Sequence, residues 1–456
     1  MAAHEPCHAA LTHMLVAFCG MGSWVPVTSL WVELPVVVKS LPEGWNLPAY
    51  LSVLIALGNV GPLALALVHK LAPGRLEERW VIHGVQGLGL IAAVFLALFW
   101  ERTVLVAGQP RSLPYLVLAL TLALVCCTSN VTFLPFMYRL PQPFVHTFFI
   151  GQGLGALFPC MLALGQGVGQ LECRKGTGHN ASQPHYLEES FSATTYFWLL
   201  FAMLAVSALA FLVLRLAMPK SPSKDSVGTE ESFPLQDSTP SPASTPAVPA
   251  PTTLAPSFWS RRTIYLLGLL GLSNALTNGV LPSVQSYSCL PYGSLAYHLA
   301  VVLSSMASSF AYFFTKFMPC RSVADLSIIS LLGCLLAAYL MVLAALSPCP
   351  PLVGSGMGVD LVVLSWILVQ VLFSFGKVRI SSLLLEADTR RDTALPQYNT
   401  VILGSSLSSA LIMLFLVSIP HLFHRGQDCM DNCMVQPPSY PLADAPEESP
   451  QLPWET

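Results

Sequence analysis

Polar side chains are set at intervals inside the long apolar stretches of this chain, and their types indicate what kind of solute they can bind. They are amides, hydroxyls, aromatic rings and one carboxylate, with almost no Lys or Arg among them. A cavity lined in this way offers flat rings for stacking and amides for paired donor and acceptor bonds, but no fixed cation for a phosphate or carboxylate. We therefore expect a neutral solute that is polar, flat at one end and rich in hydrogen-bonding groups. The candidate binding residues are Trp24, Thr28, Trp31, Glu33, Asn130, Gln152, Asn274, Asn278, Gln285 and Tyr297.

The spacing of these residues places several of them on shared helix faces. Trp24, Thr28 and Trp31 are four and three residues apart, and Asn274 and Asn278 are four apart. Residues at these separations are neighbours on an α-helix. We expect one face of rings and a hydroxyl in the first half of the chain, and one face of amides in the second.

Prolines accompany both faces. Pro26 lies within the stretch that forms the first face, Pro35 follows that stretch, and Pro282 follows the second face. A proline inside a helix leaves backbone carbonyls without an N–H partner, and transporters place such broken helices around their substrates. The sequence therefore predicts broken helices at both places.

Each polar residue also has a purely structural interpretation. Trp31 fits an interfacial aromatic belt, and Asn130 fits a hydrogen bond between helices. Gln152 lies in a Gly-rich run that is typical of close helix packing. Glu33 is hardest to assign to packing, because its nearest basic residue is Lys39. It could bind substrate, carry a proton or pair with another helix.

The composition identifies the class of protein. Hydrophobic residues make up 54% of the 456 residues, charged residues only 10%, and the mean hydropathy is +0.63. A soluble domain would carry about 25% charged residues. The numbers exclude a disordered chain, a nucleic-acid-binding protein and an ordinary cytosolic enzyme. We found no metal-ligand cluster, nucleophile elbow or nucleotide loop, so we expect neither catalysis nor a cofactor.

Long apolar stretches predict an all-α polytopic membrane protein. A spanning helix needs about 20 mostly apolar residues. Eleven stretches qualify, and the first lacks the basic start and cleavage site of a signal peptide. They cover residues 10–37, 47–69, 81–100, 113–138, 144–169, 194–216, 263–284, 294–317, 323–346, 359–380 and 398–423.

The distribution of basic residues predicts the orientation. With a cytoplasmic N-terminus, 15 of the 21 Lys and Arg residues, Lys377 among them, fall in inner loops. The positive-inside rule thus favours a cytoplasmic N-terminus and, with eleven spans, an extracellular C-terminus. This orientation places the sequon at Asn180 outside, as glycosylation requires. It also places Cys349, Cys429 and Cys433 outside, where a disulfide from Cys349 to either of the others could form, although free thiols remain the alternative.

A sharp change in composition divides the chain. Residues 219–257 contain nine Pro and 13 Ser or Thr among 39 residues, which predicts a disordered cytoplasmic linker. We expect a six-helix bundle over 1–218, a five-helix bundle over 258–424 and an extracellular tail over 425–456. Two bundles joined by a long inner loop are the plan of many secondary transporters, whose site lies between the halves.

Long strings of the sequence resemble the mammalian riboflavin transporter family. The resemblance covers nearly the whole chain except the linker and the tail beyond Cys433, which departs from the family pattern. It rests on Gly20-Met-Gly-Ser-Trp24, Trp31-Val-Glu-Leu-Pro-Val-Val-Val38, Ser129-Asn-Val-Thr-Phe-Leu-Pro-Phe136, Gly151-Gln-Gly153, Asn274-Ala-Leu-Thr-Asn-Gly-Val-Leu-Pro282 and Leu346-Ser-Pro-Cys-Pro-Pro-Leu-Val-Gly354.

The resemblance implies a function and a mechanism. Family members carry riboflavin (vitamin B2) across the plasma membrane by facilitated transport that does not depend on sodium, with eleven spans and an inner N-terminus. Their architecture is similar to equilibrative nucleoside transporters and the wider two-bundle class, which works by alternating access. Some members also resemble entry receptors for gammaretroviruses, which makes a retroviral envelope glycoprotein a further expected partner beside the lipid bilayer. The family strings fall on Trp31, Glu33, Asn274 and Asn278.

Riboflavin matches the solute expected from the polar residues. Its flat ring can stack on Trp or Tyr, and its uracil-like edge alternates donors and acceptors that suit Asn and Gln. Because no Lys or Arg is expected at the site, the sequence predicts that phosphorylated flavins are rejected.

Overall fold

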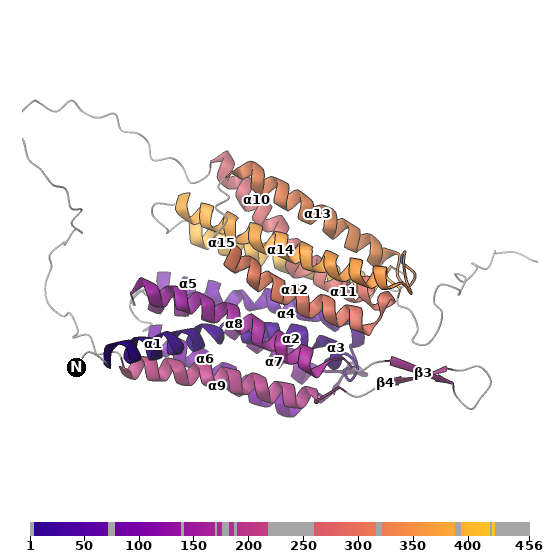
Figure 1. The fold of residues 1–456 in the computed structure, drawn as a ribbon, viewed down its shortest axis with the longest axis horizontal. Helices are drawn as coiled ribbons and strands as arrows, with labels where there is room; N and C mark the ends of the chain where they lie inside the picture. The colour runs from indigo at the N-terminus through magenta and orange to yellow at the C-terminus, as the bar shows by residue number, and fades with distance from the viewer. Residues whose placement is uncertain are drawn as a thin grey trace, which may run out of the picture.

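Two helical bundles lie side by side in the computed structural model, which describes residues 4–71, 78–137, 141–168, 171–175, 182–186, 189–217, 260–315, 322–387, 394–419 and 422–424 (Figure 1). The N-terminal bundle contains α1 (His4–Met21), α2 (Val25–Val32), α3 (Leu34–Val37), the 3-10 turn η1 (Gly44–Asn46), α4 (Leu47–Gly58), α5 (Val60–Leu71), α6 (Glu78–Phe99), α7 (Leu113–Met137), α8 (Gln142–Gln166) and α9 (Ala193–Ala217). The C-terminal bundle contains α10 (Arg261–Ala275), the π-helical turn η2 (Leu276–Val280), α11 (Leu281–Cys289), the 3-10 turn η3 (Leu290–Tyr292), α12 (Ser294–Phe314), α13 (Val323–Ala345), α14 (Gly356–Ala387) and α15 (Ala394–Ser418).

The helices confirm the expected eleven spans. Within the described ranges, ten helices or helix runs are long and apolar enough to cross a membrane, and a bent pair formed by α1 and α2 supplies an eleventh. Apolar side chains on the outward faces of these helices are exposed in large numbers, as lipid contact requires. The chain is an all-α, multi-pass membrane protein.

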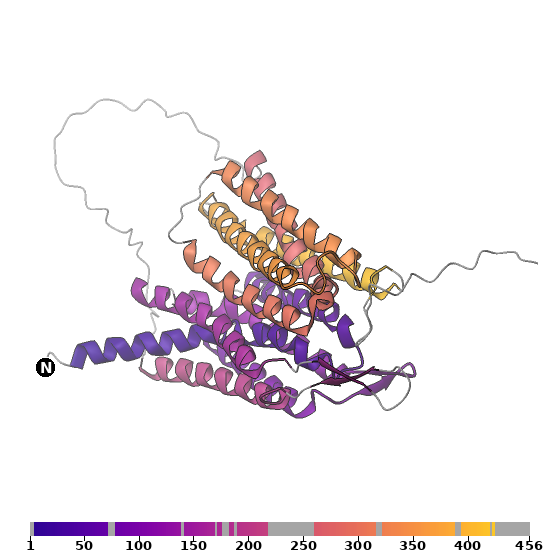
Figure 2. The same cartoon turned by 45° about the vertical axis from the view of Figure 1, so that its right-hand side comes forward.

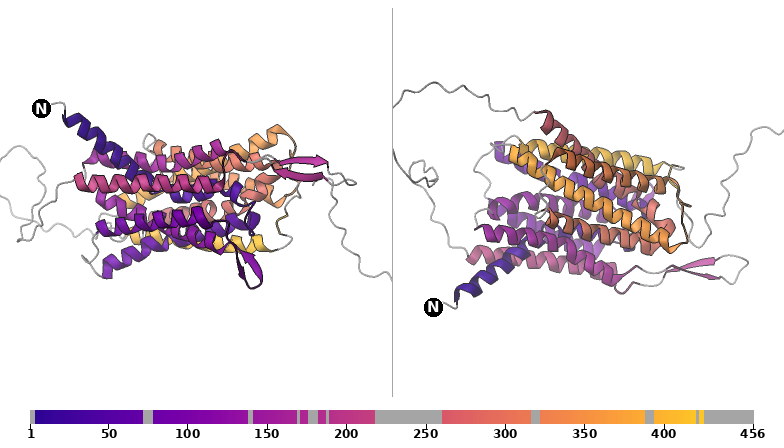
Figure 3. Two further views of the ribbon diagram at one scale, coloured as in Figure 1. Left: turned by 90° about the horizontal axis from the view of Figure 1, so that it is seen from below. Right: turned by 45° about the horizontal axis from the view of Figure 1, so that its top comes forward.

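Two short β-hairpins, which the sequence did not lead us to expect, lie at one end of the bundles. They pair β1 (Val104–Val106) with β2 (Gln109–Arg111) and β3 (Leu171–Lys175) with β4 (Ser182–Tyr186). We call this the hairpin end. The start of α1 projects from the opposite end, which we call the N-terminal end (Figures 2 and 3).

The first span is broken, as its prolines predict. The axes of α1 and α2 differ by 52°, and the break covers residues 22–24, of which Trp24 is the last. Side chains of other helices satisfy the carbonyls at the break: Cys126 Sγ donates to Ser23 O (2.9 Å), and Ser207 Oγ donates to Cys19 O (3.3 Å). Such partners are what allow irregular backbone at membrane depth.

The seventh span is irregular in the same way. The π-helical turn η2 separates α10 from α11, and Pro282 lies at the start of α11. Pro282 has no N–H for the carbonyl four residues earlier, at Asn278. Gly279 lets this turn lie against α15, because a Cβ there would fall 2.1 Å from Ser409 Oγ. Single π turns of this kind are frequent at functional sites.

Small residues allow α8 to pack directly against the backbone of α1. A Cβ at Gly151 would lie 2.0 Å from Ala17 O, and one at Gly155 would lie 2.2 Å from Met21 O. Gly153, on another side of α8, has open space instead. The expected close packing around Gln152 is confirmed.

The buried apolar clusters differ between the two ends. At the hairpin end, one cluster contains residues of both bundles, among them Leu34 and Val37 on one side and Tyr297 and Val301 on the other. At the N-terminal end, one cluster lies within α1, α6, α7, α8 and α9, and a separate one lies within α10, α13 and α14. The bundles thus share a core at the hairpin end and have separate cores at the N-terminal end.

Candidate functional site

The aromatic face of the first span begins at the break. Trp24 is the residue that precedes α2, and its side chain is 40% exposed. Thr28 is buried one turn later, and its backbone N–H donates to Trp24 O (3.2 Å). Trp31 is half-buried and packs against the cluster formed by Val27, Ala123 and Cys126. These three side chains therefore follow each other along one short, fixed helix.

Glu33 lies at the end of α2, and its side chain is fully buried. Gln166 Nε2, at the end of α8, donates to Glu33 Oε1 (3.0 Å) and also to the carbonyl of Phe191 (3.1 Å). Glu33 Oε2 has no hydrogen-bond partner within the described part of the chain. Lys39, the nearest base in the sequence, instead pairs with Glu189 (2.6 Å). A buried acidic side chain with one unpartnered oxygen is costly inside a membrane. The bond from Gln166 is a contact with another helix, so the structural interpretation of Glu33 stays open beside the functional ones.

Two further candidates lie on neighbouring helices of the same bundle. Asn130 falls within α7, but its side chain is outside what the structure describes. Gln152 is partly buried in α8, between the two glycines that contact α1. Both helices contact α2, which carries the aromatic face.

The amide face of the seventh span forms a hydrogen-bonded cluster around the π-helical turn. Asn278 Nδ2 donates to Asn274 Oδ1 (3.1 Å) and to Ser406 Oγ of α15 (3.2 Å). The first of these bonds confirms that the two Asn residues share a face. Thr277 Oγ1 donates to Ser273 O (2.8 Å). The cluster lies roughly halfway along the candidate span Arg261–Tyr292.

The remaining predicted residues lie where the bundles meet at the hairpin end. Gln285 is buried in α11. The ring of Tyr297 in α12 packs edge-on against Trp45 of η1, with centroids 5.0 Å apart. Tyr287, two residues after Gln285, donates from its Oη to Oδ1 of Asn46, the residue after Trp45 (3.4 Å). Trp45 and Asn46 were not among the predicted residues, and their signal is only an aromatic ring and an amide at the start of the candidate span Gly44–Val68.

Lys377 corrects the sequence analysis, which counted it in an inner loop and expected no cation at the site. The helix α14 continues to Ala387, so Lys377 lies well inside it and within the candidate span Gly356–Leu384. Its Nζ donates to Thr277 Oγ1 (3.0 Å), within the amide cluster. The placement of Lys377 in an inner loop is therefore wrong, and a cation lies beside predicted site residues.

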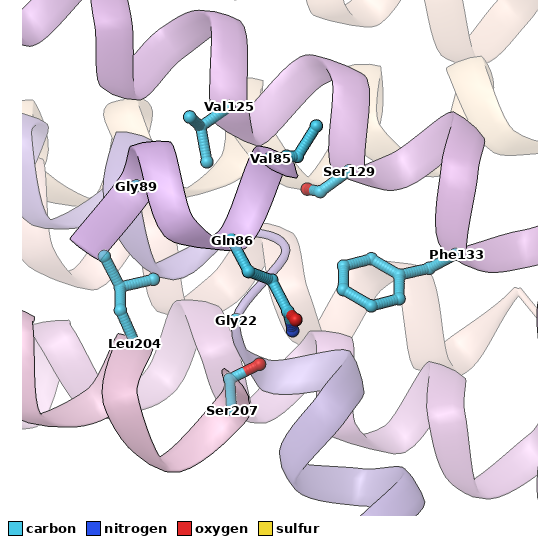
Figure 4. Close-up of a pocket in the computed structure, with 9 residues that line it drawn as sticks. All are labelled: Gly22, Val85, Gln86, Gly89, Val125, Ser129, Phe133, Leu204 and Ser207. Carbon is cyan, nitrogen blue, oxygen red and sulfur yellow. The ribbon is translucent and has the colours of Figure 1, made fainter. Parts of the chain in front are cut away.

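A small cavity beside the α1–α2 break contains another group that the sequence analysis missed. The cavity has a volume of about 20 Å³, and Gln86, Ser129 and Ser207 direct their polar ends toward it beside Gly22 (Figure 4). The amide of Gln86 is buried, and neither of its polar atoms has a hydrogen-bond partner within the described ranges. The volume is enough for one water molecule, which the surrounding hydroxyls and amide could bind.

Several predictions fall outside the described residues. These are the sequon at Asn180, Cys429, Cys433 and the linker 219–257. Cys349 forms a disulfide, but because both expected partners lie in that part of the chain, the pairing stays a prediction. Where the structure describes the chain, no group of three or more His, Cys, Asp or Glu is arranged to hold a metal ion.

Comparison with known proteins gives concordant results at the level of sequence and of fold. The family model described as "Solute carrier family 52, riboflavin transporter" matches residues 8–425. The chain is 50% identical to "Solute carrier family 52, riboflavin transporter, member 2" of Papio hamadryas and 49% identical to member 1 of Homo sapiens, each over 95% of this chain and 100% of the relative. Its fold is similar to a crystal structure of a D-xylose–proton symporter, at 13% identity, with 90% of each chain covered and a TM-score of 0.51. The chain therefore belongs to solute carrier family 52, the riboflavin transporters.

Proposed function

We propose that this protein carries riboflavin across the plasma membrane into the cell. The observation that carries the proposal is the 50% identity, over nearly the full length of both chains, to a relative named as a riboflavin transporter. At this similarity the polar residues that bind a solute are expected to be retained together with the fold. The site described above is consistent with such a solute.

The chemistry of the site suits riboflavin. The amides of Asn274 and Asn278 and the hydroxyl of Ser406 offer donors and acceptors to a uracil-like ring edge. Trp24 and Trp31 offer rings against which a flat isoalloxazine can stack. Both sets lie next to breaks in their spans, and transporters place such broken helices around their substrates.

The distribution of buried clusters supports alternating access. A core shared by both bundles closes the hairpin end, while separate cores at the N-terminal end leave the two bundles free to part there. Rocking of one bundle against the other would exchange these arrangements and expose the site to each side in turn. With the N-terminus in the cytoplasm, the closed hairpin end faces outward.

This orientation also assigns the other segments. Residues 219–257 would link the bundles 1–218 and 258–424 on the cytoplasmic side, and the tail 425–456 would lie outside. Transport would be driven by the riboflavin gradient alone, without sodium.

A role as entry receptor for gammaretroviruses is a second candidate. The specific observation in its favour is that the β3–β4 hairpin extends beyond the helices at the hairpin end (Figure 1), where an envelope glycoprotein could reach it. Such a role needs no transport. Binding of envelope to a transport-inactive Glu33 variant would support it, and loss of binding only when the hairpins are replaced would locate the contact.

Reconstituted protein tests the mechanism. Purified protein in proteoliposomes should take up labelled riboflavin faster when the interior is preloaded with unlabelled riboflavin, because a loaded carrier returns faster than an empty one. The rate should not change when choline replaces sodium. Uptake that is unaffected by preloading would contradict alternating access, and uptake that requires sodium would contradict the proposed driving force.

A further inference from the structure

Lys377 places a cation within a candidate membrane span, Gly356–Leu384. Its helix, α14, runs from Gly356 to Ala387, and its ammonium reaches Thr277, which is about halfway along the opposing broken span. The hydroxyl of Thr277 donates to Ser273 O (2.8 Å), so its oxygen is left to accept from Lys377 (3.0 Å). Thr277 thereby fixes the direction of the ammonium.

This ammonium has no carboxylate partner within the described residues, where the one ion pair joins Lys39 to Glu189 at the hairpin end. A charged side chain at the membrane centre costs about 3 kcal/mol or more unless it is compensated. The amide cluster does not depend on the ammonium, because Asn278 Nδ2 donates to Asn274 and Ser406 without it. Intramembrane charges kept at such a cost are usually functional.

The polar groups of Lys377 that lack a hydrogen-bond partner among the described residues are all donors. An ammonium carries three N–H bonds and no acceptor, and the structure gives one of them a partner. The residue as a whole is of intermediate burial. A ligand at this place must therefore present an acceptor, either a neutral carbonyl or an anionic oxygen.

The surroundings favour the neutral acceptor. A phosphate is usually held by several charge-assisted bonds. Arg379, the next cation along α14, lies two residues away and so points about 200° around the helix from Lys377. A single ammonium beside amides and hydroxyls matches a carbonyl of a flat heterocycle better than it matches a dianion.

We propose that Lys377 donates a hydrogen bond to a carbonyl oxygen of the substrate's pyrimidine ring, with Thr277 as a positioning residue. The inference rests on the proposed function, and it names the group of this chain that recognises the acceptor edge of the flavin. The amides of the neighbouring cluster remain for the rest of that edge.

Inhibition of labelled riboflavin uptake tests the contact. We compare five proteins at matched surface levels: wild type, Lys377→Met, Lys377→Arg, Thr277→Val and a control, Arg261→Met. Arg261 lies at the exposed start of α10. The competitors are riboflavin, 2-thioriboflavin, 4-thioriboflavin and flavin mononucleotide. A thiocarbonyl is a poor acceptor. A bond from a charged donor to a carbonyl corresponds to about 10- to 100-fold in affinity.

One thio analogue should bind wild type about 10- to 100-fold more weakly than riboflavin does. In Lys377→Met, the same analogue should bind as tightly as riboflavin. Lys377→Arg should recover part of the riboflavin affinity, Thr277→Val should fall between wild type and Lys377→Met, and Arg261→Met should match wild type. Purified Lys377→Met should be no less thermally stable than wild type, because the variant removes an uncompensated charge.

Three results would overturn the inference. One is wild-type uptake that Lys377→Met leaves unchanged. Another is a ratio of the affinity for the thio analogue to the affinity for riboflavin that is the same in wild type and in Lys377→Met. The third is a mononucleotide that competes as well as riboflavin in wild type and only weakly in Lys377→Met, which would assign the lysine to an anion. Absence of saturable uptake by wild type would instead overturn the proposed function itself, and this inference with it.

Discussion

Replacing Trp45 with Leu should weaken closure at the hairpin end. Trp45 belongs to the N-terminal bundle and packs edge-on against Tyr297 of the C-terminal bundle, with centroids 5.0 Å apart and planes at 89°. Leucine keeps an apolar side chain against the shared core but loses the ring contact. Such aromatic pairs contribute about 1 kcal/mol beyond the area that they bury.

This energy acts on the equilibrium between the closed and open forms of the hairpin end. About 1 kcal/mol changes a two-state ratio about fivefold. A closed form favoured by about 20 to 1 would then be favoured by only about 4 to 1. The contact between Trp45 and Tyr297 exists only when this end is closed. Its loss therefore changes the ratio of closed to open forms by the full contact energy.

Distances between spin labels can report the shift. Leu105 in β1 and Met357 at the start of α14 are 75% and 77% exposed, and they lie at the hairpin end of different bundles. Labels carried there by noncanonical amino acids leave the native cysteines in place. Trp45→Leu should enlarge the long-distance component about fourfold, from about 5% to about 20% of the population.

Trp198→Leu provides a matched control, because Trp198 makes the same kind of edge-on contact with Phe201 but within a single helix, α9. The control should leave the distance distribution unchanged. An unchanged distribution in Trp45→Leu, or an equal shift in both variants, would refute the assignment of this contact to closure.

Three other substitutions test the site and its support. Gly155→Ala should lower stability by about 3 kcal/mol, because its Cβ would meet a backbone oxygen at 2.2 Å, whereas Gly153→Ala has open space and should be neutral; thermal unfolding of the purified variants checks both. Glu33→Gln keeps the shape and the bond from Gln166, so it should reach the cell surface normally and reduce uptake about tenfold, and normal uptake at normal surface level would exclude a functional carboxylate. Gln86→Met should leave the thermal midpoint equal or higher, since it removes a buried amide without a hydrogen-bond partner among the described residues, and a lower midpoint would contradict this account.

The spans and the breaks could be predicted because they depend on local chemistry. About 20 apolar residues must form a helix in lipid, and Pro26 and Pro282 must interrupt one. The pairing of Asn274 with Asn278 follows equally from their separation by one helical turn.

Other features depend on contacts between distant segments, which spacing does not reveal. Lys377 follows an apolar stretch and is followed closely by Arg379, so it has the appearance of a loop residue. Only packing of α14 against the π-helical turn shows that its ammonium reaches Thr277. Gln86 likewise has the appearance of an ordinary polar residue of α6, and its position beside the first break emerges only when α1, α7 and α9 are assembled around it.

Uptake of radiolabelled riboflavin by cells that express the chain tests the central claim most directly. The protein is quantified at the surface, and excess unlabelled riboflavin serves as competitor. The account predicts saturable uptake that unlabelled riboflavin abolishes. Uptake no greater than in control cells, with the protein shown at the surface, would contradict it.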